Sequence, residues 1–388
     1  MKSLSSLFFN LKGRRIQVGT FIGIPERDDL LFEYDPFWIE NGFALSFDAP
    51  LSSKTLRTSK QNPTLGFVRD LVPGNPARKV ILKKGLHPND IIDLIFMSSD
   101  YVRPGSLEIS GAGFMPADAK KSNTLFSDME RLLVENFNFK DIDLLYGSIS
   151  PLPGEQYKAS FLDGNNLNII SKFNTPNPLR NFVVFEAASL QMAQALGMRA
   201  AVPRILNFRG NLVLLEKRFD RMPSGQKIHF ATAKGLLNLE DESEVSYSNI
   251  ADILNREGAH PDRDLPELWK RMIFSMAIGN THDDASNIGF LREADGWSLS
   301  PMYSLTPTPA SPMRRHHATG VSPDNNSPDI GEAIHLSRYF CLSEKQAKDI
   351  ALEMVSFVNK NWMNFAKNCG ADRIQIDNMK KAFEPLDF

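Results

Sequence analysis

The sequence has few cysteines, little net charge and no long apolar run. Only Cys341 and Cys369 occur among 388 residues, too few for a disulfide framework or a structural zinc site, so a reducing cytoplasm is the expected location. The formal net charge of −2 gives no global electrostatic argument for binding nucleic acid. No uninterrupted apolar segment is long enough to span a bilayer. We therefore expect a cytoplasmic protein with no membrane partner.

Two common phosphate-binding patterns are absent as well. Neither G-x-x-x-x-G-K-[ST] nor G-x-G-x-x-G occurs in the chain. A nucleotide site, if the protein has one, must be of another kind.

A composition of 42% hydrophobic residues is enough for a large core and two or three domains. "MKSLSSLFFNLKGRR" is expected to be a first strand and not a signal peptide, because no small-residue cleavage site follows its apolar run. Strand and turn signals continue through "RRIQVGTFIG", "LLFEYDPFWIE" and "NGFALSFDAPL", and helical patterns come after them around "FVRDLVPGNPARKVILKKG" and "HPNDIIDLIFMSS". These patterns predict a small amino-terminal α+β domain.

The pattern changes after about residue 145. "PGEQYKASFLDGNNLNIISKFNTPNP" predicts two strands joined by a tight turn, and "LRNFVVFEAASLQMAQALGM" predicts a helix ended by Gly197. Short extended segments come next, and beyond about residue 230 the chain is mostly helical apart from one hairpin. Between the two regions, "FSDMERLLVENFNFKDIDLLYG" is typical of a helix and a strand with no long polar linker, so the amino-terminal domain should pack on the strands after residue 145.

Lys172 and Glu186 are the first candidates for chemistry. Glu186 lies within a helix that is apolar nearly all round, where a buried carboxylate is costly unless a cation meets it. Lys172, on the strand before this helix, could be that cation. A strand lysine paired with a helix glutamate is how protein kinases hold the α- and β-phosphates of ATP. The alternative is that Lys172 extends its amine to solvent and Glu186 lies at an exposed edge of its helix.

The segment "VLLEKRFDR" ends a strand with Glu216, Lys217 and Arg218. Such a cluster is commonly a solvated strand end. Its position, however, is where a kinase chain crosses from the small lobe to the large lobe.

The polar loop "NTHDDASN" lies between a helix and a hairpin. A kinase catalytic loop places its aspartate five residues before the asparagine that holds a magnesium ion. Counting back five residues from Asn287 gives His282, with Asp283 and Asp284 after it. The hairpin "IGFLREADGWSLSPMYS" should deliver a second metal ligand at Ser304. The architecture fits a kinase, and two carboxylates are replaced.

A metal-dependent phosphohydrolase around His282 and Asp283 is another interpretation, because histidine and aspartate together suit a divalent cation. His316 and His317 are available as further ligands, but their spacing specifies nothing.

Many of these segments, in the same order, resemble the HipA family of kinase-fold toxins from bacterial toxin–antitoxin pairs. The resemblance is carried by "FEYDPFWIENGFALSFDAPL", "FVRDLVPGNPAR", "LPGEQYKASF", "FEAASLQMAQALGM", "LLEKRFDR", "ELWKRMIFSMAIGN" and "LSPMYSLTPT". It implies an α+β, protein-kinase-like two-lobe fold with an additional amino-terminal α+β domain packed on the small lobe. The expected divisions are residues 1–140, the small lobe 141–222 and the helical large lobe 223–388.

The resemblance also implies roles for individual residues. Lys172 would bind ATP phosphates with Glu186 as its partner, and the backbone from Glu216 to Arg218 would form the adenine-facing hinge. The family loop reads N-T-D-D-H-x-x-N, so His282 takes the place of the catalytic aspartate. The family sequence YDLTPT reads YSLTPT here, so Asn287 keeps one magnesium ligand while Ser304 replaces the other.

Three functions are compatible with these residues. The first is an active ATP- and Mg²⁺-dependent serine/threonine kinase toxin in which Asp283 or Asp284 serves as the base. The second is a pseudokinase that binds nucleotide or a partner with impaired phosphotransfer, because a serine hydroxyl and an imidazole are poor ligands for Mg²⁺. The third is the phosphohydrolase. The resemblance further implies a small helix-turn-helix antitoxin as partner, with operator DNA contacted through that partner, and a protein substrate.

Overall fold

The fold is described from a computed structural model. The structure describes residues 3–23, 30–58, 63–111, 156, 158–162, 168–173, 181–208, 211–239, 245–310 and 315–386. The chain divides into two compact units. The first unit consists of residues 1–172 and 217–240, and the second unit consists of residues 173–216 and 241–388.

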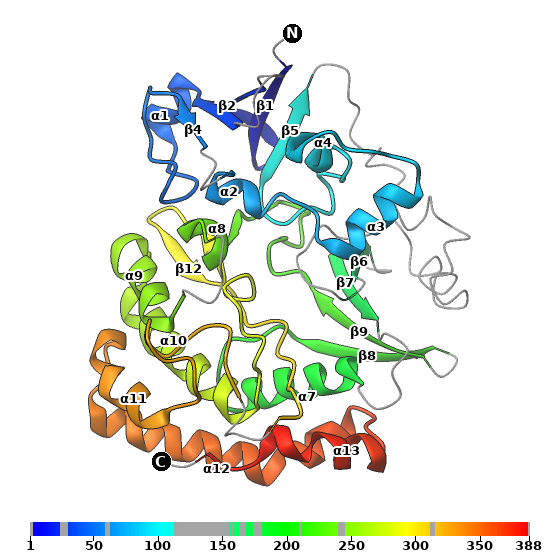
Figure 1. The fold of residues 1–388 in the computed structure, drawn as a ribbon, viewed down its shortest axis with the longest axis vertical. Helices are drawn as coiled ribbons and strands as arrows, with labels where there is room; N and C mark the ends of the chain where they lie inside the picture. The colour runs from blue at the N-terminus through cyan, green and yellow to red at the C-terminus, as the bar shows by residue number, and fades with distance from the viewer. Residues whose placement is uncertain are drawn as a thin grey trace. The chain divides into compact units, whose positions relative to one another are not determined.

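The first unit begins with a five-stranded antiparallel sheet (Figure 1). Its order is β4-β3-β2-β1-β5, where the strands are β1 (Ser3–Leu11), β2 (Arg14–Gly23), β3 (Leu30–Tyr34), β4 (Leu56–Arg57) and β5 (Leu107–Gly111). Alternate residues of these strands, such as Leu7, Val18 and Phe32, enter one apolar core. The predicted first strand is therefore confirmed as β1.

Four short helices accompany this sheet: α1 (Pro36–Asn41), α2 (Gly66–Arg69), α3 (Asn75–Lys83) and α4 (Ile91–Phe96). The last three confirm the helical patterns. The interpretation of "DPFWIE" as strand is wrong, because Asp35 caps α1 by accepting a hydrogen bond from Phe37 N at 2.9 Å and Pro36 suits its first turn.

The segment "NGFALSFDAPL" forms no strand either. The hydroxyl of Tyr34 donates to Ala49 O at 2.7 Å and accepts from Leu45 N at 3.2 Å. These bonds fold the segment back onto the end of β3. Its alternating pattern therefore reflects a loop that buries Leu45 and Ala49.

The rest of the first unit joins the amino-terminal domain to the small-lobe elements. The hairpin of β6 (Lys158–Leu162) and β7 (Asn168–Phe173) confirms the two predicted strands. The segment 217–240 carries β10 (Phe230–Thr232) and α8 (Ala233–Leu237). Arg218 lies in this segment and donates to Val102 O at 2.8 Å, while its own N–H donates to Asn168 O at 2.9 Å. The amino-terminal domain is therefore packed on β7 through Arg218.

A second contact holds α8 against α2. The carboxylate of Asp70 accepts from Thr232 N at 2.8 Å and from Thr232 Oγ1 at 2.6 Å. A Cβ on Gly235 would come within 2.2 Å of that carboxylate, and a Cβ on Gly66 would come within 2.1 Å of Gly235 O. Two glycines are thus required where these helices meet.

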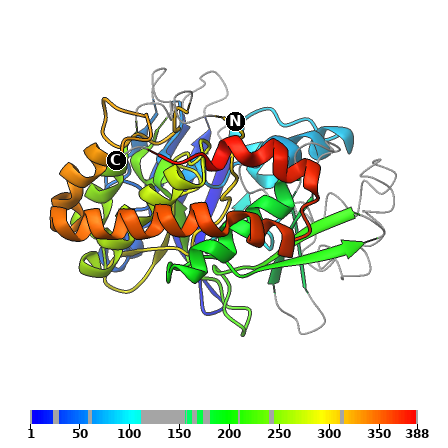
Figure 2. The same ribbon diagram turned by 90° about the horizontal axis from the view of Figure 1, so that it is seen from below.

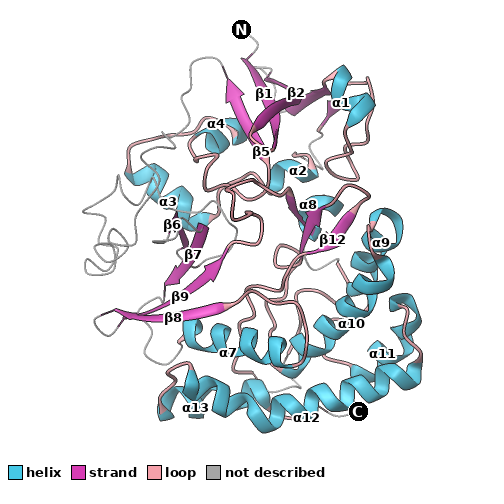
Figure 3. Ribbon diagram, turned by 180° about the vertical axis from the view of Figure 1, so that it is seen from behind, coloured by secondary structure: helices cyan, strands magenta, loops and turns pink. Residues whose placement is uncertain are grey.

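The second unit is mainly helical (Figure 3). Its helices are α7 (Phe182–Ala195), α9 (Tyr247–Glu257), α10 (Pro261–Ala277), α11 (Ile330–His335), α12 (Glu344–Asn368) and α13 (Arg373–Met379), with the 3-10 helices η3 (Leu336–Phe340) and η4 (Lys380–Phe383). Helix α12 packs against both α7 and α10 (Figure 2). Gly197 has φ +76° just after α7, as the predicted helix end requires.

Two antiparallel hairpins complete the second unit. They are β8 (Pro203–Phe208) with β9 (Asn211–Lys217), and β11 (Gly289–Arg292) with β12 (Trp297–Leu299). The second one confirms the hairpin predicted after the polar loop.

Some predicted features lie outside the described residues. These are the turn "DGNN", the connection "NTPNP" and the helix and strand within 126–147. None of the described helices combines the length and the apolar character that a membrane span requires.

Candidate functional site

Helix α10 and a glycine set the position of the polar loop. The helix is buried along most of its length, and Trp269 Nε1 donates to Ala333 O at 2.8 Å. It ends at Ala277, and Gly279 then turns the chain with φ +64°. A Cβ at this position would lie 2.6 Å from Ala382 O, so only glycine fits. The loop from 280 to 287 therefore starts from a fixed point.

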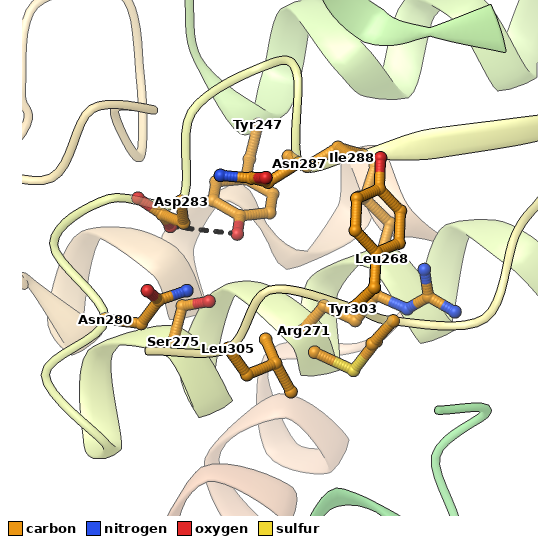
Figure 4. A pocket seen from close by; sticks show the side chains of 11 residues that line it. Tyr247, Leu268, Arg271, Ser275, Asn280, Asp283, Asn287, Ile288, Tyr303 and Leu305 are labelled. Atoms are coloured by element: carbon orange, nitrogen blue, oxygen red, sulfur yellow. Dashed lines mark hydrogen bonds between the residues drawn. The ribbon is translucent and has the colours of Figure 1, made fainter. Parts of the chain in front are cut away.

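Asp283 points into the second unit (Figure 4). Its side chain is 4% exposed, and its two oxygens lie 3.1 Å from the hydroxyl of Tyr247 and 3.3 Å from His317 Nδ1. Thr319 Oγ1 donates to the main-chain carbonyl of Asp283 at 2.5 Å. Burial first, and the charge of Asp283 second, raise the pKa of Tyr247 well above its ordinary value, so that hydroxyl remains a donor. Asp283 thus fastens the loop to α9 and to the chain around 317–319.

Hydrogen bonds within the loop join Asp284 to Ser286 and Asn287 to residues before it. Asp284 is half-buried and accepts hydrogen bonds from both the N–H and the hydroxyl of Ser286. Asn287 N donates to Asp284 O at 2.8 Å, and Asn287 Nδ2 donates to His282 O at 2.9 Å. The side chain of His282 is exposed. The loop is therefore a compact turn that presents His282 to solvent and leaves Asn287 Oδ1 as an acceptor.

The hairpin of β11 and β12 leads the chain to Ser304. Ser300 N donates to Gly289 O at 2.9 Å, and the hydroxyl of Tyr303 donates to Ser286 O at 2.9 Å, so the strand that returns from the hairpin is held beside the loop. Ser304 has φ +57°. Aspartate and asparagine adopt this left-handed conformation more readily than most other residues with a side chain. The backbone at Ser304 therefore suits the carboxylate that the family pattern places there.

A small cavity of about 30 Å³ lies next to the loop (Figure 4). It has room for roughly one or two water molecules. Its lining includes the residues Tyr247, Arg271, Ser275, Asn280, Asp283, Asn287 and Tyr303. The carboxylate among them, that of Asp283, is already bound by Tyr247 and His317.

The residues at the two expected magnesium positions fit this ion poorly. Magnesium in kinase sites is held by carboxylate oxygens in near-octahedral geometry. Asn287 and Ser304 offer one amide oxygen and one hydroxyl, both neutral. The donor set of these two positions thus lacks the charge that balances Mg²⁺.

The described residues provide no set of metal ligands for the phosphohydrolase interpretation. Nowhere among them do three or more His, Cys, Asp or Glu side chains gather so that they could hold a metal ion. His282 is exposed whereas Asp283 is buried, so these neighbours face different surroundings. His316 is exposed, and its Nδ1 lies 3.2 Å from Asn326 Oδ1, whereas Nδ1 of His317 is hydrogen-bonded to Asp283.

Lys172 and Glu186 are both buried, at 3% and 1% exposure. Lys172 is on β7 in the first unit, and Glu186 is on α7 in the second unit. The interpretation in which these two side chains lie exposed is therefore wrong. Because the two residues belong to different units, their pairing stays a prediction.

The expected hinge residues differ in their surroundings. Glu216 is buried and Lys217 is exposed at the end of β9. The N–H of Arg218 donates to Asn168 O at 2.9 Å. The interpretation of this stretch as a solvated strand end holds for Lys217 alone. The role of the three residues as an adenine-facing hinge stays a prediction.

The side chain of Arg218 belongs to a buried ionic cluster. Its guanidinium donates two hydrogen bonds of 2.8 and 2.7 Å to the carboxylate of Asp220, and Arg221 donates one of 2.8 Å to the same carboxylate. Burial alone would raise the pKa of Asp220, but the charges of Arg218 and Arg221 outweigh it and hold that pKa below its ordinary value. The cluster also binds main-chain carbonyls of Val102, Arg103 and Gly105. Arg218 is thus a structural clamp within the first unit.

Two family profiles match the chain. The HipA N-terminal domain matches residues 13–124, and the HipA-like C-terminal domain matches residues 150–362, which is more than half of the chain. This protein belongs to the HipA family. The resemblance inferred from the motifs is therefore confirmed.

A solved structure of a HipA toxin confirms the fold of this HipA-family chain. The HipA toxin of Shewanella oneidensis MR-1, solved with HipB and its operator DNA, is 15% identical and superposes with a TM-score of 0.68 over 97% of this chain and 95% of that chain. Such a match shows the predicted α+β, protein-kinase-like fold with its additional amino-terminal domain. The Helicobacter pylori proinflammatory kinase CtkA is 14% identical, with a TM-score of 0.40 over 59% of this chain and 90% of that chain.

A curated relative matches over a shorter stretch. The Sinorhizobium fredii protein named "Putative kinase Y4mE" is 26% identical over 137 residues, which are 33% of this chain and 33% of that protein. The match thus spans about a third of the length of that relative.

Tyr247, His317 and Thr319 are the residues of this HipA-family site that the sequence reasoning missed. Tyr247 opens α9, and the other two lie 34 and 36 residues beyond Asp283. Single-sequence spacing contains no signal for such contacts. The adjacent pair His316 and His317 drew attention only as possible metal ligands.

Proposed function

We propose that this protein is a HipA-family kinase-fold component of a toxin–antitoxin type system in which phosphotransfer is impaired. The cause is local to two side chains. His282 stands at the position of the catalytic base, and Ser304 stands at the position of the second metal ligand.

One observation carries the proposal: the carboxylate of Asp283 is turned inward and bound. It is 4% exposed and contacts both Tyr247 and His317. It therefore cannot accept a proton from a substrate hydroxyl without giving up these bonds. Phosphoryl transfer depends on positioning and on neutralising charge with metal ions, and Asn287 with Ser304 supplies only neutral oxygens.

The rival proposal, an active kinase toxin, must therefore use Asp284. This carboxylate is half-buried, and its bonds to Ser286 are local to the loop. Asp284→Asn should abolish ATP turnover under the rival proposal and change nothing under ours.

Nucleotide binding and a protein partner complete the proposal. Two buried and oppositely charged residues, Lys172 and Glu186, support retention of a phosphate-binding pair. The likeness to a toxin solved with HipB and operator DNA supports a small helix-turn-helix antitoxin as partner, with DNA contacted through it.

Thermal-shift titration with ATP, with and without Mg²⁺, tests the proposal. ATP at about 100 times its dissociation constant stabilises the folded state by about 3 kcal/mol. The melting temperature should therefore rise by a few degrees. Mg²⁺ should add little to this shift in the unmodified chain, and should add more in Ser304→Asp. A shift that appears only with Mg²⁺ in the unmodified chain would contradict the proposal.

Two lysine variants make the ATP shift specific. Lys172→Met should remove it, because the variant lacks the cation expected to meet the phosphates. Lys348→Met is the matched control, because Lys348 is an exposed residue of α12. Equal shifts in the two variants would remove the support for Lys172 as a nucleotide ligand.

A further inference from the structure

Arg315 is a fully buried cation whose hydrogen bonds to the described residues all go to main-chain carbonyls. Its Nε donates to Ala310 O at 3.0 Å and one terminal nitrogen donates to Met276 O at 3.2 Å. The other terminal nitrogen donates to Lys381 O at 2.8 Å and Ala382 O at 2.6 Å. The side chain is 1% exposed. One guanidinium thus joins three separate stretches of the second unit.

The carbonyls that Arg315 binds lie where a cation is favourable. Met276 is in the last turn of α10, and Lys381 and Ala382 are in η4. Carbonyls at helix ends lack partners within the helix and carry partial negative charge. Burial lowers the pKa of Arg315 to about 10, which leaves it charged at neutral pH. Removing the side chain would take one donor from each of these carbonyls, although Met276 O also accepts from Gly279 N at 3.1 Å.

The base of the polar loop touches the same carboxyl-terminal stretch. Gly279, with φ +64°, approaches Ala382 so closely that a Cβ would lie 2.6 Å from its carbonyl oxygen. Thr308 N donates to Gly279 O at 2.8 Å. Phe383 anchors η4 by stacking on Trp362, with ring centroids 4.3 Å apart. Gly279 is therefore held by η4 and by the chain that precedes Arg315.

The chain after Arg315 continues directly onto the loop. Ala318 N donates to Thr281 O at 3.0 Å. His317 and Thr319 then contact the side chain and the carbonyl of Asp283. The residues that contact the loop thus lie only two to four positions after Arg315, so a displacement of Arg315 would also displace them.

We propose that Arg315 is a positioning residue that fastens η4 to the base of the loop, so that the position of residues 279–287 depends on the carboxyl-terminal stretch 379–386. This dependence is a conformational device of the fold. It does not rest on whether the loop transfers phosphate. Anything that pulls the carboxyl-terminal stretch away from α10 would release the loop.

Amide hydrogen exchange of the full chain tests the proposal. Arg315→Met keeps the length of the side chain and removes its five donors. Exchange of the amides in 279–287 and in 379–386 should then accelerate together, by at least about tenfold, because both stretches open locally. Helices α9 and α12 should keep their protection. Acceleration in one stretch without the other would overturn the proposal.

The reciprocal variant is Phe383→Leu, which weakens the stacking on Trp362 and leaves Arg315 intact. If η4 holds the loop, this variant should also accelerate exchange at 279–287, although it lies far from that stretch in the sequence. Combined with Arg315→Met it should add little, because the two changes break one coupled unit. Full additivity, or a loop unaffected by Phe383→Leu, would refute the dependence.

Arg373→Met provides the matched control. Arg373 belongs to the same carboxyl-terminal region, but its side chain is 96% exposed. Its replacement should leave exchange at 279–287 unchanged. If Arg315→Met does not fold, Phe383→Leu compared with Arg373→Met still decides the question.

Discussion

Asp283→Ala should destabilise the second unit strongly, because Asp283 is a structural tie. The change leaves the hydroxyl of Tyr247 and Nδ1 of His317, now 3.1 and 3.3 Å from the carboxylate, without their acceptor. Each buried group left unpaired costs about 1 to 3 kcal/mol. Tyr247 also bonds to Ser275, so its share should be at the lower end. We expect a total loss of about 3 kcal/mol in the free energy of unfolding.

Chemical denaturation monitored by tryptophan fluorescence measures this loss. The sequence has four tryptophans, and Trp269, Trp297 and Trp362 lie in the second unit, so the signal reports mainly on it. Asp283→Asn should cost only about 1 kcal/mol, because an amide oxygen still accepts from Tyr247.

The matched control for this measurement is Asp295→Asn. Asp295 is exposed in the turn of the β11–β12 hairpin, and its replacement should change stability by less than about 0.5 kcal/mol. If Asp283→Ala lost no more than this control, the carboxylate would be free for another role and our reasoning would fail.

Three further outcomes are expected from single contacts. Ser304→Gly should raise the free energy of unfolding by up to about 1 kcal/mol, since φ +57° strains serine and not glycine; a decrease in urea titrations would contradict this. Burial raises the pKa of Asp70 to about 6 from 3.8, so the contribution of this group to stability is present below about pH 4 and is lost as the pH rises through 6. Relative to Asp70→Asn, the unmodified chain should lose about 3 kcal/mol between pH 4 and 7, and parallel pH profiles would refute this. Arg218→Met should lower the free energy of unfolding by about 3 to 5 kcal/mol in denaturant titrations, because Asp220 then keeps one cation. Arg14→Met, at an exposed position, is the control. An equally small loss in both variants would show that Arg218 is not a structural clamp.

Local signals were sufficient to predict the elements around the site. The end of α10, the polar loop after it and the β11–β12 hairpin follow one another directly in the sequence. Each of these features is decided by neighbours within a few residues. The loop was therefore located correctly between a helix and a hairpin.

The roles of charged residues inside this frame could not be predicted in the same way. Arg218 looked like part of a solvated strand end because its acceptors, such as Val102 O, lie 116 residues earlier. Asp283 looked available as a base because Tyr247 and His317 lie 36 and 34 residues away. Burial of a charge depends on partners that only the folded chain brings together.

The error at "DPFWIE" has a different cause. The capping residue Asp35 and the adjacent Pro36 were visible in the sequence and are typical of a helix start. The aromatic residues Phe37 and Trp38 favoured a strand by propensity. A local capping bond outweighed that weak preference, and the segment became α1.

The most direct test of the central claim is Mg²⁺-dependent phosphate release from ATP, measured on the unmodified chain beside His282→Asp combined with Ser304→Asp. A missing general base alone lowers a rate by about 10²- to 10⁴-fold. We predict no turnover above background for the unmodified chain and clear turnover for the double variant, with each single change restoring much less because the residues of one catalytic unit act together. Robust Mg²⁺-dependent turnover by the unmodified chain would contradict the claim that His282 and Ser304 have disabled this site.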